Sequence, residues 1–448
     1  MNVLASQIAS WTGGRLVGAD VRLTAAGQDT RTLPAGALYV ALRGERADGH
    51  DFAAQVQGHA GAALVERELP LALPQIVVAD SERALQSLAQ AWLQTLDLRC
   101  VAMTGSNGKT TTKMLTASIL RQVGPTHATP GNYNNEIGVP LTVLGLDASH
   151  RYAVIEMGCG KPGDIDLLAE IAPPHAAAVI NVAPAHLERL GSVEGVAIAK
   201  AGIYRQMRAD GIAVIPAEDR YADYFRAQAG ARRRLEYAVD LAADVRAEAL
   251  RVGLHSSFRL CTPAGSAAIE LRLPGRHHVH NALAAATLAL AVGAPLEAIA
   301  AGLASAEAVD GRGRRIEVAG SVVYDDSYNA NPGSLAAAIE TLALDAAPRW
   351  LVLGDMAELG TDAAALHARC GALARERGIE RLYAIGPLSA HATAAFGSAA
   401  QHFERIEDLI AAVQTDLAPG VTVLVKGSRS ARMERVVQAL TGGHGGAH

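Results

Sequence analysis

Short apolar runs alternate with amphipathic stretches along most of this chain, and the alternation predicts an ordered series of strands and helices. Residues 98–103 form an apolar run typical of a buried strand, and residues 110–122 have helical spacing. Apolar runs at 152–158, 176–183 and 211–218 are each followed by helix-like sequence. Strands and helices in this order are typical of a doubly wound parallel sheet.

The pattern changes on both sides of this region. The first 81 residues carry short apolar runs between polar turns and one helical pattern at the start, which predicts a small α/β domain. Residues 235–273 lose the alternation and predict several short strands, before a helical pattern resumes at 275–292. From residue 321 onward strands and helices alternate again, which indicates a Rossmann-like unit.

We therefore expect an α/β protein of three domains, at residues 1–81, 82–312 and 313–448. The central domain is predicted to contain a phosphate-binding loop on a doubly wound parallel sheet, between a small N-terminal α/β domain and a C-terminal Rossmann-like domain. A length of 448 residues agrees with three domains, at roughly 150 residues each. The glycine-rich end, residues 442–448, is predicted to be disordered.

Composition narrows the class of protein. The formal net charge of −5 gives no general attraction to nucleic acid or to an anionic membrane. The four cysteines are scattered and form no C-x-x-C pair, which argues against a disulfide framework or a zinc site. No apolar run is long enough for a membrane span, and the first residues lack the basic start of a signal peptide. We expect a cytoplasmic protein that neither binds nucleic acid nor inserts into membranes.

The stretch from Met103 to Lys113, MTGSNGKTTTK, has the end of a phosphate-binding loop but an unusual beginning. The common pattern G-x-x-x-x-G-K-[ST] requires glycine where this chain has Met103. The strand before it and the helix after it are the context in which backbone N–H groups can converge on phosphate oxygens. We expect Lys109 to neutralise the outer phosphates and Thr110 to hold magnesium; a glycine-rich turn that binds nothing is the alternative.

Polar residues follow several of the predicted strands, at the sheet edge where ligands of open α/β sheets bind. Glu156 ends an otherwise apolar strand and requires a partner, either a magnesium ion or a nearby Lys or Arg. His186 follows the next strand, and a histidine in such a place is more often structural than a ligand. Lys200 lies among apolar helix residues, where a buried amine would have a lowered pKa and could form a carbamate. The residue pattern alone favours a surface lysine instead.

Two further groups of polar residues indicate binding surfaces. Residues 129–141 contain three asparagines within four positions, which suits either a loop that contacts a ligand or a simple turn. In the third domain, residues 324–334, 353–360 and 423–430 each place polar groups where a strand gives way to a loop. Three polar strand ends on one sheet predict a second binding face.

Taken together, these motifs resemble the Mur ligases, ATP-dependent enzymes that form amide bonds in peptidoglycan precursors. The resemblance covers almost the whole chain, and its motifs occur in family order: DTRTLPAGALYVALRGERADGHDF, TGSNGKTTTK, GNYNNEIGVP, AHLERLGS, GRHHVHNALAAA, DDSYNANPGS, VLGDMAELG and VLVKGSRSARME. The GNYNNEIGVP, DDSYNANP and GDMAELG forms point to the member that joins D-alanyl-D-alanine to UDP-N-acetylmuramoyl-tripeptide.

The resemblance implies a role for each matching position. Catalytic and metal-binding roles fall on Lys109, Thr110, Glu156, His186 and a carbamylated Lys200, with ATP and Mg²⁺ as cofactors. The implied nucleotide contacts are Thr104, Gly105, Ser106, Asn107, Gly108, Lys109, Thr110, Thr111, Asn281, Arg312 and Asp326. The implied substrate contacts are Thr30, Arg31, Asp48, Gly49, His50, Asn134, Asn135, Ser327, Asn329, Asn331 and Lys426.

Two positions depart from the family pattern. Gly202 stands where a glutamate commonly follows the carbamylated lysine by two places, and Gly160 stands where asparagine or serine is common. The first leaves a supporting carboxylate unaccounted for, and the second removes one polar contact near the magnesium or the substrate.

The resemblance implies that the tripeptide carboxylate becomes an acyl phosphate, which the amine of the dipeptide then attacks. The third domain must close over that reactive group, so residues 311–313 are a candidate hinge, and the chain is expected to act as a monomer. The alternatives are a Mur ligase that adds the third peptide residue, a folylpolyglutamate synthase, or a nucleotide-gated binding protein that makes no bond.

Overall fold

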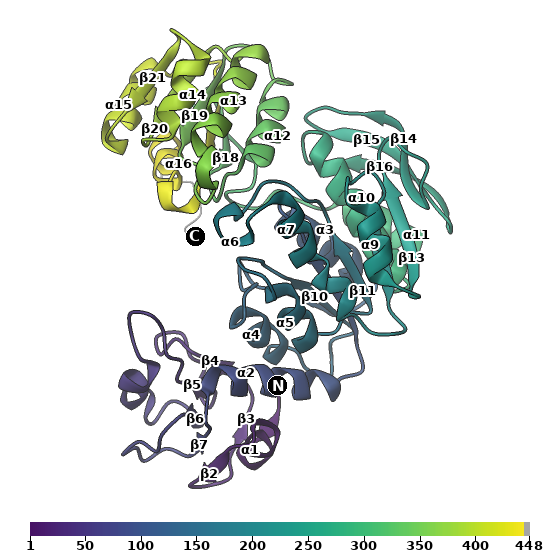
Figure 1. Cartoon of the computed structure of the whole chain (residues 1–448), viewed down its shortest axis with the longest axis vertical. Helices are drawn as coiled ribbons and strands as arrows, with labels where there is room; N and C mark the ends of the chain where they lie inside the picture. The colour runs from purple at the N-terminus through teal and green to yellow at the C-terminus, as the bar shows by residue number, and fades with distance from the viewer. Residues whose placement is uncertain (443–448) are drawn as a thin grey trace.

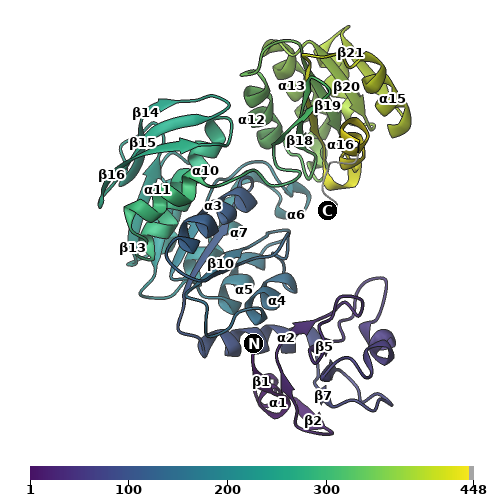
Figure 2. The same cartoon turned by 180° about the vertical axis from the view of Figure 1, so that it is seen from behind.

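The computed structural model describes residues 1–442, so the disorder predicted for the chain end falls, from residue 443 on, outside the described residues. The chain forms three α/β parts, with the N-terminal and C-terminal parts at opposite ends of the central one (Figures 1 and 2). Among the described residues no helix is both long and apolar enough to cross a membrane.

The N-terminal part contains a small, mostly parallel sheet. Its five strands lie in the order β2 (Arg15–Val17), β7 (Gln75–Val77), β6 (Ala62–Val65), β5 (Leu38–Val40) and β4 (Ala26–Gly27), with β2 antiparallel to β7. A separate pair joins β1 (Val3–Leu4) to β3 (Arg22–Leu23). The predicted first helix is α1 (Ala5–Thr12), and a 3₁₀ helix, η1 (Gly49–Val56), follows β5. The expected small α/β domain is therefore present.

The central part is built on one nine-stranded sheet. Its order is β16 (Gly265–Leu271), β15 (Ser256–Thr262), β14 (Val245–Arg251), β13 (Arg233–Ala238), β12 (Ile212–Pro216), β11 (Ala176–Val179), β8 (Arg99–Thr104), β10 (Tyr152–Glu156) and β9 (Thr126–Ala128). Neighbouring strands from β9 to β14 are parallel, and β15 and β16 add an antiparallel edge. The short strands predicted for residues 235–273 thus extend the same sheet.

Helices cover both faces of this sheet, because its parallel strands carry apolar side chains on both sides. One face packs against α3 (Lys109–Arg121), α10 (Arg276–Ala291) and α11 (Leu296–Ala304). The other packs against α2 (Ser81–Gln94), α4 (Gly138–Leu144), α5 (Asp164–Ile171), α7 (Val193–Lys200), α8 (Gly202–Arg205) and α9 (Ala222–Ala229). The predicted doubly wound arrangement is confirmed, since both faces of the sheet are buried under helices.

The C-terminal part contains a six-stranded sheet. Its order is β17 (Arg314–Val318), β18 (Ser321–Asp326), β22 (Thr422–Lys426), β19 (Arg349–Gly354), β20 (Arg381–Ile385) and β21 (Ala400–Phe403), parallel apart from β17. One face packs against α12 (Pro332–Leu342), α13 (Ala363–Glu376) and α14 (Ser389–Phe396), and the other against α15 (Ile406–Asp416) and α16 (Glu434–Thr441). This is the expected Rossmann-like unit.

Candidate active site

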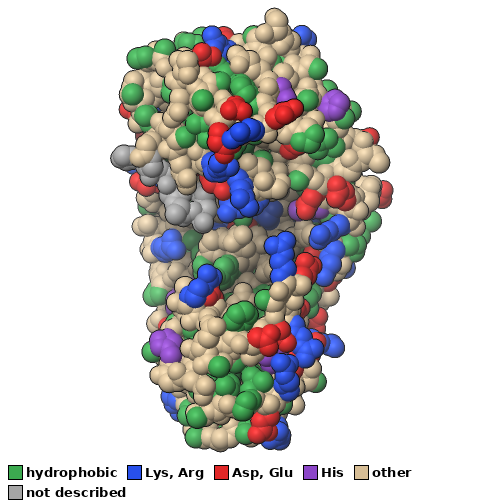
Figure 3. Space-filling model, turned by 90° about the vertical axis from the view of Figure 1, so that its left-hand side faces the viewer, with side chains coloured by type: hydrophobic (Ala, Val, Ile, Leu, Met, Phe, Trp, Pro, Cys, Tyr) green, Lys and Arg blue, Asp and Glu red, His purple; other side chains and the backbone are tan. Residues whose placement is uncertain are grey.

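A cavity of about 730 Å³ lies between the central and C-terminal parts. It is lined by the phosphate loop, by the asparagine-rich loop and by the ends of the strands of the C-terminal sheet. Basic side chains gather at mid-height on the face drawn in Figure 3, around the hollow between the upper and lower halves of the molecule. Among the described residues, the cavity is lined by five basic and four acidic side chains, so positive charge is available there for an anionic ligand although the chain has a net negative charge; they are Lys109, Lys161, Arg189, Arg312 and Lys426, and Glu136, Glu156, Asp164 and Asp326.

The phosphate loop connects β8 to α3, as predicted. Gly108 has φ +78°, and a Cβ at this position would overlap the side-chain amide of Asn281 on α10. Only glycine satisfies both conditions. Asn181 holds the loop from the neighbouring strand: its Oδ1 accepts from Asn107 N (2.9 Å) and its Nδ2 donates to Asn107 O (3.0 Å). These contacts therefore hold the loop in one conformation.

Lys109 opens α3, and its Nζ donates to Gly105 O (2.8 Å). Burial lowers its pKa, while the Glu156 carboxylate opposes that change. Thr110 and Thr111 line the cavity with it, whereas Thr104 and Gly105 do not, and Thr104 is fully buried at the end of β8. The structure thus brings most of the predicted nucleotide contacts of the loop to one wall.

Glu156 is 2 % exposed at the end of β10. Its Oε1 accepts from Asn134 Nδ2 (2.7 Å), and its Oε2 lies 3.1 Å from Lys113 Nζ. Burial alone would raise the pKa of Glu156, but the positive charges of Lys113 and Lys109 outweigh it, and the net effect is a lowered pKa. The structure therefore shows the lysine partner that was the alternative for this carboxylate, while a magnesium partner stays a prediction; Glu156 lines the cavity.

Sequence reasoning missed Lys113. Its Nζ also donates to Gly131 O (2.8 Å), so it joins the carboxylate to the start of the asparagine-rich loop. Lys113 follows Lys109 by one turn of α3, and residues four apart share a helix face. That spacing was a signal that both lysines face the same site.

His186 precedes the short helix α6 (Leu187–Leu190) and has φ +53°, which is uncommon for a residue with a side chain. Its Nδ1 lies 2.5 Å from Oε2 of Glu358, a residue of the C-terminal part. Burial lowers the pKa of His186, and the Glu358 carboxylate partly offsets this. His186 lines the cavity together with Glu156.

Lys200 is 2 % exposed at the end of α7, so the surface lysine that the residue pattern favoured is wrong. The bulk of the central domain buries the stem and the amine together. Burial and the nearby charge of Lys109 lower its pKa to about 7. Its Nζ forms no hydrogen bond or ion pair with the residues that the structure describes, so no partner offsets the cost of burying the charged form.

The two glycines that depart from the family pattern lie near this lysine and the cavity. A Cβ at Gly202 would overlap the carboxylate of Asp166 on α5, which is paired with Arg205 (2.8 Å). A carboxylate from another helix therefore occupies the space of a side chain at 202. Gly160 lines the cavity, and its N–H donates to Asp164 (2.8 Å).

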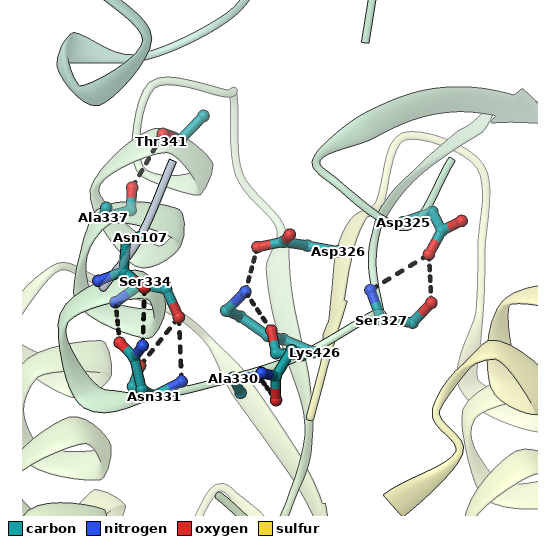
Figure 4. A network of polar contacts seen from close by, with 11 residues as sticks. Asn107, Asp325, Asp326, Ser327, Ala330, Asn331, Ser334, Ala337, Thr341 and Lys426 are labelled. Carbon is teal, nitrogen blue, oxygen red and sulfur yellow. Dashed lines mark hydrogen bonds and ion pairs between the residues drawn. The ribbon is translucent and has the colours of Figure 1, made fainter. Parts of the chain in front are cut away.

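The C-terminal part contributes a polar wall, drawn in Figure 4. Lys426 is buried at the end of β22, pairs with Asp326 at the end of β18 and donates to Asn329 O (3.1 Å). Asn331 caps α12 and donates from Nδ2 to Asn107 Oδ1 (2.7 Å) across the cavity. These four residues line the cavity with Asn281 and Arg312. Ser327 does not line it; its hydroxyl is fully buried and bonds to Asp325 (2.5 Å).

The asparagine-rich loop forms another wall. Asn134 and Asn135 both line the cavity. Asn134 is bonded to Glu156, and Asn135 Oδ1 accepts from Gly138 N (2.9 Å) at the start of α4. The loop is therefore an ordered turn that also forms part of the cavity wall, so the structure is compatible with both interpretations of its sequence.

The predicted substrate residues of the N-terminal part do not line this cavity. Thr30 and Arg31 are exposed or half-buried near Gln55 and Asp29. His50 is buried, with Nδ1 2.5 Å from Asp48 and Nε2 accepting from Glu66 N (2.9 Å). Gly49 lies against Leu42 at the end of β5. The five residues Thr30, Arg31, Asp48, Gly49 and His50 therefore form a separate polar region.

The chemistry of the cavity suits magnesium bound with a nucleotide. No group of three His, Cys, Asp or Glu side chains gathers as a metal site anywhere in residues 1–442. The predicted ligands include only two such residues, Glu156 and His186, so a magnesium ion here would need further oxygen ligands from nucleotide phosphates, the Thr110 hydroxyl or a carbamate on Lys200. Glu156 Oε2 accepts no hydrogen bond in the described chain but lies 3.1 Å from Lys113 Nζ, so a metal ion at this oxygen would share it with the Lys113 ammonium group.

Comparison with known proteins places this architecture in a family. Residues 103–289 match the Mur ligase middle domain, and residues 311–429 match the Mur ligase glutamate ligase domain. A UDP-N-acetylmuramoyl-tripeptide–D-alanyl-D-alanine ligase of Escherichia coli K12 is 45% identical over 447 residues, covering 98% of each chain. The chain therefore belongs to the Mur ligase family.

Within that family, two solved structures that match this chain over nearly its whole length at 27–34% identity are MurF ligases. A MurF crystal structure from Acinetobacter baumannii has a TM-score of 0.92 and 34% identity, covering 98% of this chain and 99% of that one. A MurF ligase from Thermotoga maritima in complex with ADP has a TM-score of 0.83 and 27% identity, covering 94% of this chain and 97% of that one. The resemblance to this member of the family is confirmed.

Proposed function

We propose that this protein joins D-alanyl-D-alanine to UDP-N-acetylmuramoyl-tripeptide with cleavage of ATP to ADP and phosphate, and so makes the pentapeptide precursor of peptidoglycan. One observation carries the proposal: a single cavity contains a phosphate loop, two potential metal ligands and the polar strand ends of a separate domain. The names and the near full-length similarity of the relatives support it.

The phosphate loop would hold the triphosphate through its backbone N–H groups and Lys109. Asn281, against Gly108, and Arg312, beside Tyr328, would bind the rest of the nucleotide. Asp326 would contribute from the C-terminal domain. The relative with bound ADP supports a nucleotide in this fold.

Magnesium would be held by Thr110, Glu156 and His186, with Lys200 as a carbamate. When bound, it would neutralise the charge that develops on the transferred phosphate. A buried amine with a pKa near 7 supports carbamate formation, since the neutral amine is the form that reacts with carbon dioxide. Lys113 keeps Glu156 ionised and fixes it beside the asparagine-rich loop.

The reaction would proceed in two steps. An oxygen of the tripeptide carboxylate attacks the γ-phosphorus, a bond forms between them, and the bond to the β-phosphate oxygen breaks with release of ADP. The amine of the dipeptide then attacks the acyl carbon, phosphate leaves with the bonding electrons, and the proton lost by the amine is taken up by the released phosphate. Lys109 stabilises the negative charge of the first step.

The C-terminal domain would bind the dipeptide and exclude water from the acyl phosphate. Asn329, Asn331 and Lys426 line the cavity opposite the phosphate loop and are the proposed dipeptide contacts. The side chains of Asn134 and Asn135 would contact the sugar-peptide. Ser327 is better explained as a support of the strand end, because its hydroxyl is buried against Asp325.

The polar region of the N-terminal domain would bind the uridine end. There Asp48 and Arg31 are the accessible groups, and His50 would act by fixing Asp48. We also propose that the protein acts as a cytoplasmic monomer. One chain supplies every wall of the cavity, and all four cysteines are unpaired.

The deciding experiment measures phosphate release with ATP, Mg²⁺ and UDP-N-acetylmuramoyl-tripeptide, with and without D-alanyl-D-alanine. We expect release to depend on the dipeptide. Release without dependence on any amine would favour a nucleotide switch, and stimulation by a single amino acid would favour another ligase of the superfamily. Those ligases match this chain at only 18–20% identity, which supports the shared fold alone.

Two substitutions test the assigned residues. Lys109→Ala should lower kcat by about 10²–10³, the range for loss of one group that stabilises developing charge. Lys200→Ala should abolish turnover, and added bicarbonate should not restore it. Ile198→Ala, an exposed position on the same helix as Lys200, is the matched control. Near-normal activity of Lys200→Ala would remove this residue from the site.

A further inference from the structure

His186 and Glu358 come from different domains and meet at two points. Nδ1 of His186 lies 2.5 Å from Oε2 of Glu358, and the backbone N–H of Leu187 donates to Glu358 O (3.2 Å). The side chains are 35% and 46% exposed, so the ion pair alone would contribute little. The backbone bond fixes the relative position of the two loops, and the side-chain contact then fixes the imidazole.

Both residues have left-handed backbone conformations, with φ +53° at His186 and φ +61° at Glu358. Such conformations are unfavourable for residues with a Cβ, and they persist where the surroundings impose them. Two of these residues facing each other across a domain boundary indicate that the contact is constrained from both sides.

The loop that carries Glu358 is held rigidly within the C-terminal domain. His367, buried on α13, accepts from Met356 N (2.9 Å) and donates from Nδ1 to Ala363 O (2.7 Å). Ser428 N donates to Asp355 O (2.9 Å) on the other side. Glu358 therefore moves with the C-terminal domain, and its approach to His186 reports the position of that whole domain.

A carboxylate that accepts from one imidazole nitrogen fixes the tautomer and leaves the other nitrogen free to bind a metal. Nδ1 of His186 is used in this way, and Nε2 has no partner among the described residues, although His186 lines the cavity. We propose that Glu358 is a positioning residue for His186, supplied by the C-terminal domain on closure, which prepares Nε2 to bind the divalent cation. This inference rests on the proposed function, because it deepens the role of His186 there.

The direct test measures Mn²⁺ affinity by the electron paramagnetic resonance signal of free Mn²⁺. The full-length protein is used with a non-hydrolysable ATP analogue and UDP-N-acetylmuramoyl-tripeptide. Glu358→Ala should bind Mn²⁺ about 10-fold to 100-fold more weakly, the range for loss of a carboxylate that supports a ligand histidine. Glu404→Ala, which removes an exposed carboxylate of the same domain, should bind as the wild type does.

Glu358→Gln separates orientation from charge, because its amide oxygen still accepts a hydrogen bond but carries no charge. It should keep more of the affinity than Glu358→Ala. Equal losses in the two variants would mean that the carboxylate acts only by long-range attraction, and would overturn the proposal. So would unchanged affinity in Glu358→Ala.

Steady-state kinetics gives an independent readout. In Glu358→Ala the half-saturating Mg²⁺ concentration should rise while the KM for the dipeptide stays constant. If the wild type shows dipeptide-dependent phosphate release and Glu358→Ala keeps its Mn²⁺ affinity, only this inference fails. If the wild type shows no such release, the proposed function itself fails.

Discussion

The joint between the N-terminal and central domains consists of packed apolar side chains, whereas the joint between the central and C-terminal domains consists mainly of polar contacts. At the first, α2 packs against α1 on one side and against α4 and α5 on the other, within one continuous core. The N-terminal amine of Met1 also donates to Leu144 O (3.0 Å) on α4. The cores of the C-terminal domain are separate from this one.

At the second joint, the named contacts are Asn107 with Asn331 and His186 with Glu358. The connecting chain passes through Gly311 and Gly313, with φ +70° and +80°, conformations that favour glycine. Gly311 N also donates to Asp325 of the C-terminal domain (3.0 Å), so a pivot at this segment would lie on its central-domain side.

The difference matches the needs of the proposed reaction. An apolar joint is costly to open, because it would expose buried carbon to water. A few polar contacts exchange readily with water, since each contributes only about 0.5–1.5 kcal/mol net. The N-terminal and central domains should therefore behave as one rigid unit that presents the tripeptide end to ATP, while the C-terminal domain opens to admit substrates and closes for chemistry.

The largest expected effect comes from breaking the apolar joint. Leu88 on α2 is fully buried in the shared core, so Leu88→Ala should lower the free energy of unfolding by about 2–5 kcal/mol. Chemical denaturation measures the change in the free energy of unfolding. Calorimetry should show that the unfolding transition of the N-terminal and central unit shifts to lower temperature and that the transition of the C-terminal domain does not. Ser87→Ala, exposed on the same helix, is the control. A shift of both transitions would mean that the three domains unfold as one.

Acidification is a second way to distinguish the unfolding of the N-terminal and central unit from that of the C-terminal domain. Burial lowers the pKa of His278, on α10, to about 4, against an ordinary value near 6.5. The unfolded chain therefore binds a proton between pH 6.5 and 4 that the folded chain does not. Stability from this group is complete above pH 6.5 and is lost as the pH falls toward 4, by at most about 3 kcal/mol.

The measurement is calorimetry of the wild type and of His278→Asn at pH 7 and pH 5. Asparagine keeps a donor for Pro274 O, which His278 Nδ1 contacts at 2.6 Å, but it does not titrate. We expect the variant to lose less stability on acidification, and only in the transition of the N-terminal and central unit. An identical pH dependence in the two proteins would contradict the assignment of this histidine.

Features set by local pattern could be predicted from the sequence. The middle residues of strands such as β8 and β10 are all apolar because helices cover both faces of the sheet, so the polar residues at the strand ends stand out in the sequence. Lys109, Glu156 and the asparagine-rich loop were found in this way and lie together in the cavity. The family resemblance added Lys200, which the residue pattern alone had placed at the surface.

Features that depend on pairings distant in the chain could not be predicted. The sequence pattern predicts β15 and β16 as short strands. Their place at the edge of the central sheet depends on antiparallel pairing, which no local pattern specifies. The contact of His186 with Glu358 joins positions 172 residues apart and depends on how two domains meet. The space at Gly202 is filled by Asp166 from another helix, which only the fold reveals.

The smallest expected effect comes from the polar joint, and it tests the comparison most directly. Asn331 has two separable roles: its Oδ1 caps α12 by accepting from Ser334 N (2.9 Å), and its Nδ2 donates to Asn107 across the joint. Serine also caps helices but is too short to reach Asn107. Asn331→Ser should therefore leave the melting of the C-terminal domain within about 0.5 kcal/mol of the wild type.

The same variant should lower kcat/KM for the dipeptide by up to roughly tenfold, the equivalent of one net hydrogen bond made on closure. Asn331→Ala removes the cap as well and should cost about 1 kcal/mol of stability in addition. If Asn331→Ser destabilised the C-terminal domain and left kcat/KM unchanged, the contact would support the fold and would have no part in closure. The opposite result would establish that Asn331 acts in the reaction, through the contact with Asn107 or through its proposed contact with the dipeptide, and that it does so without contributing to the stability of the domain.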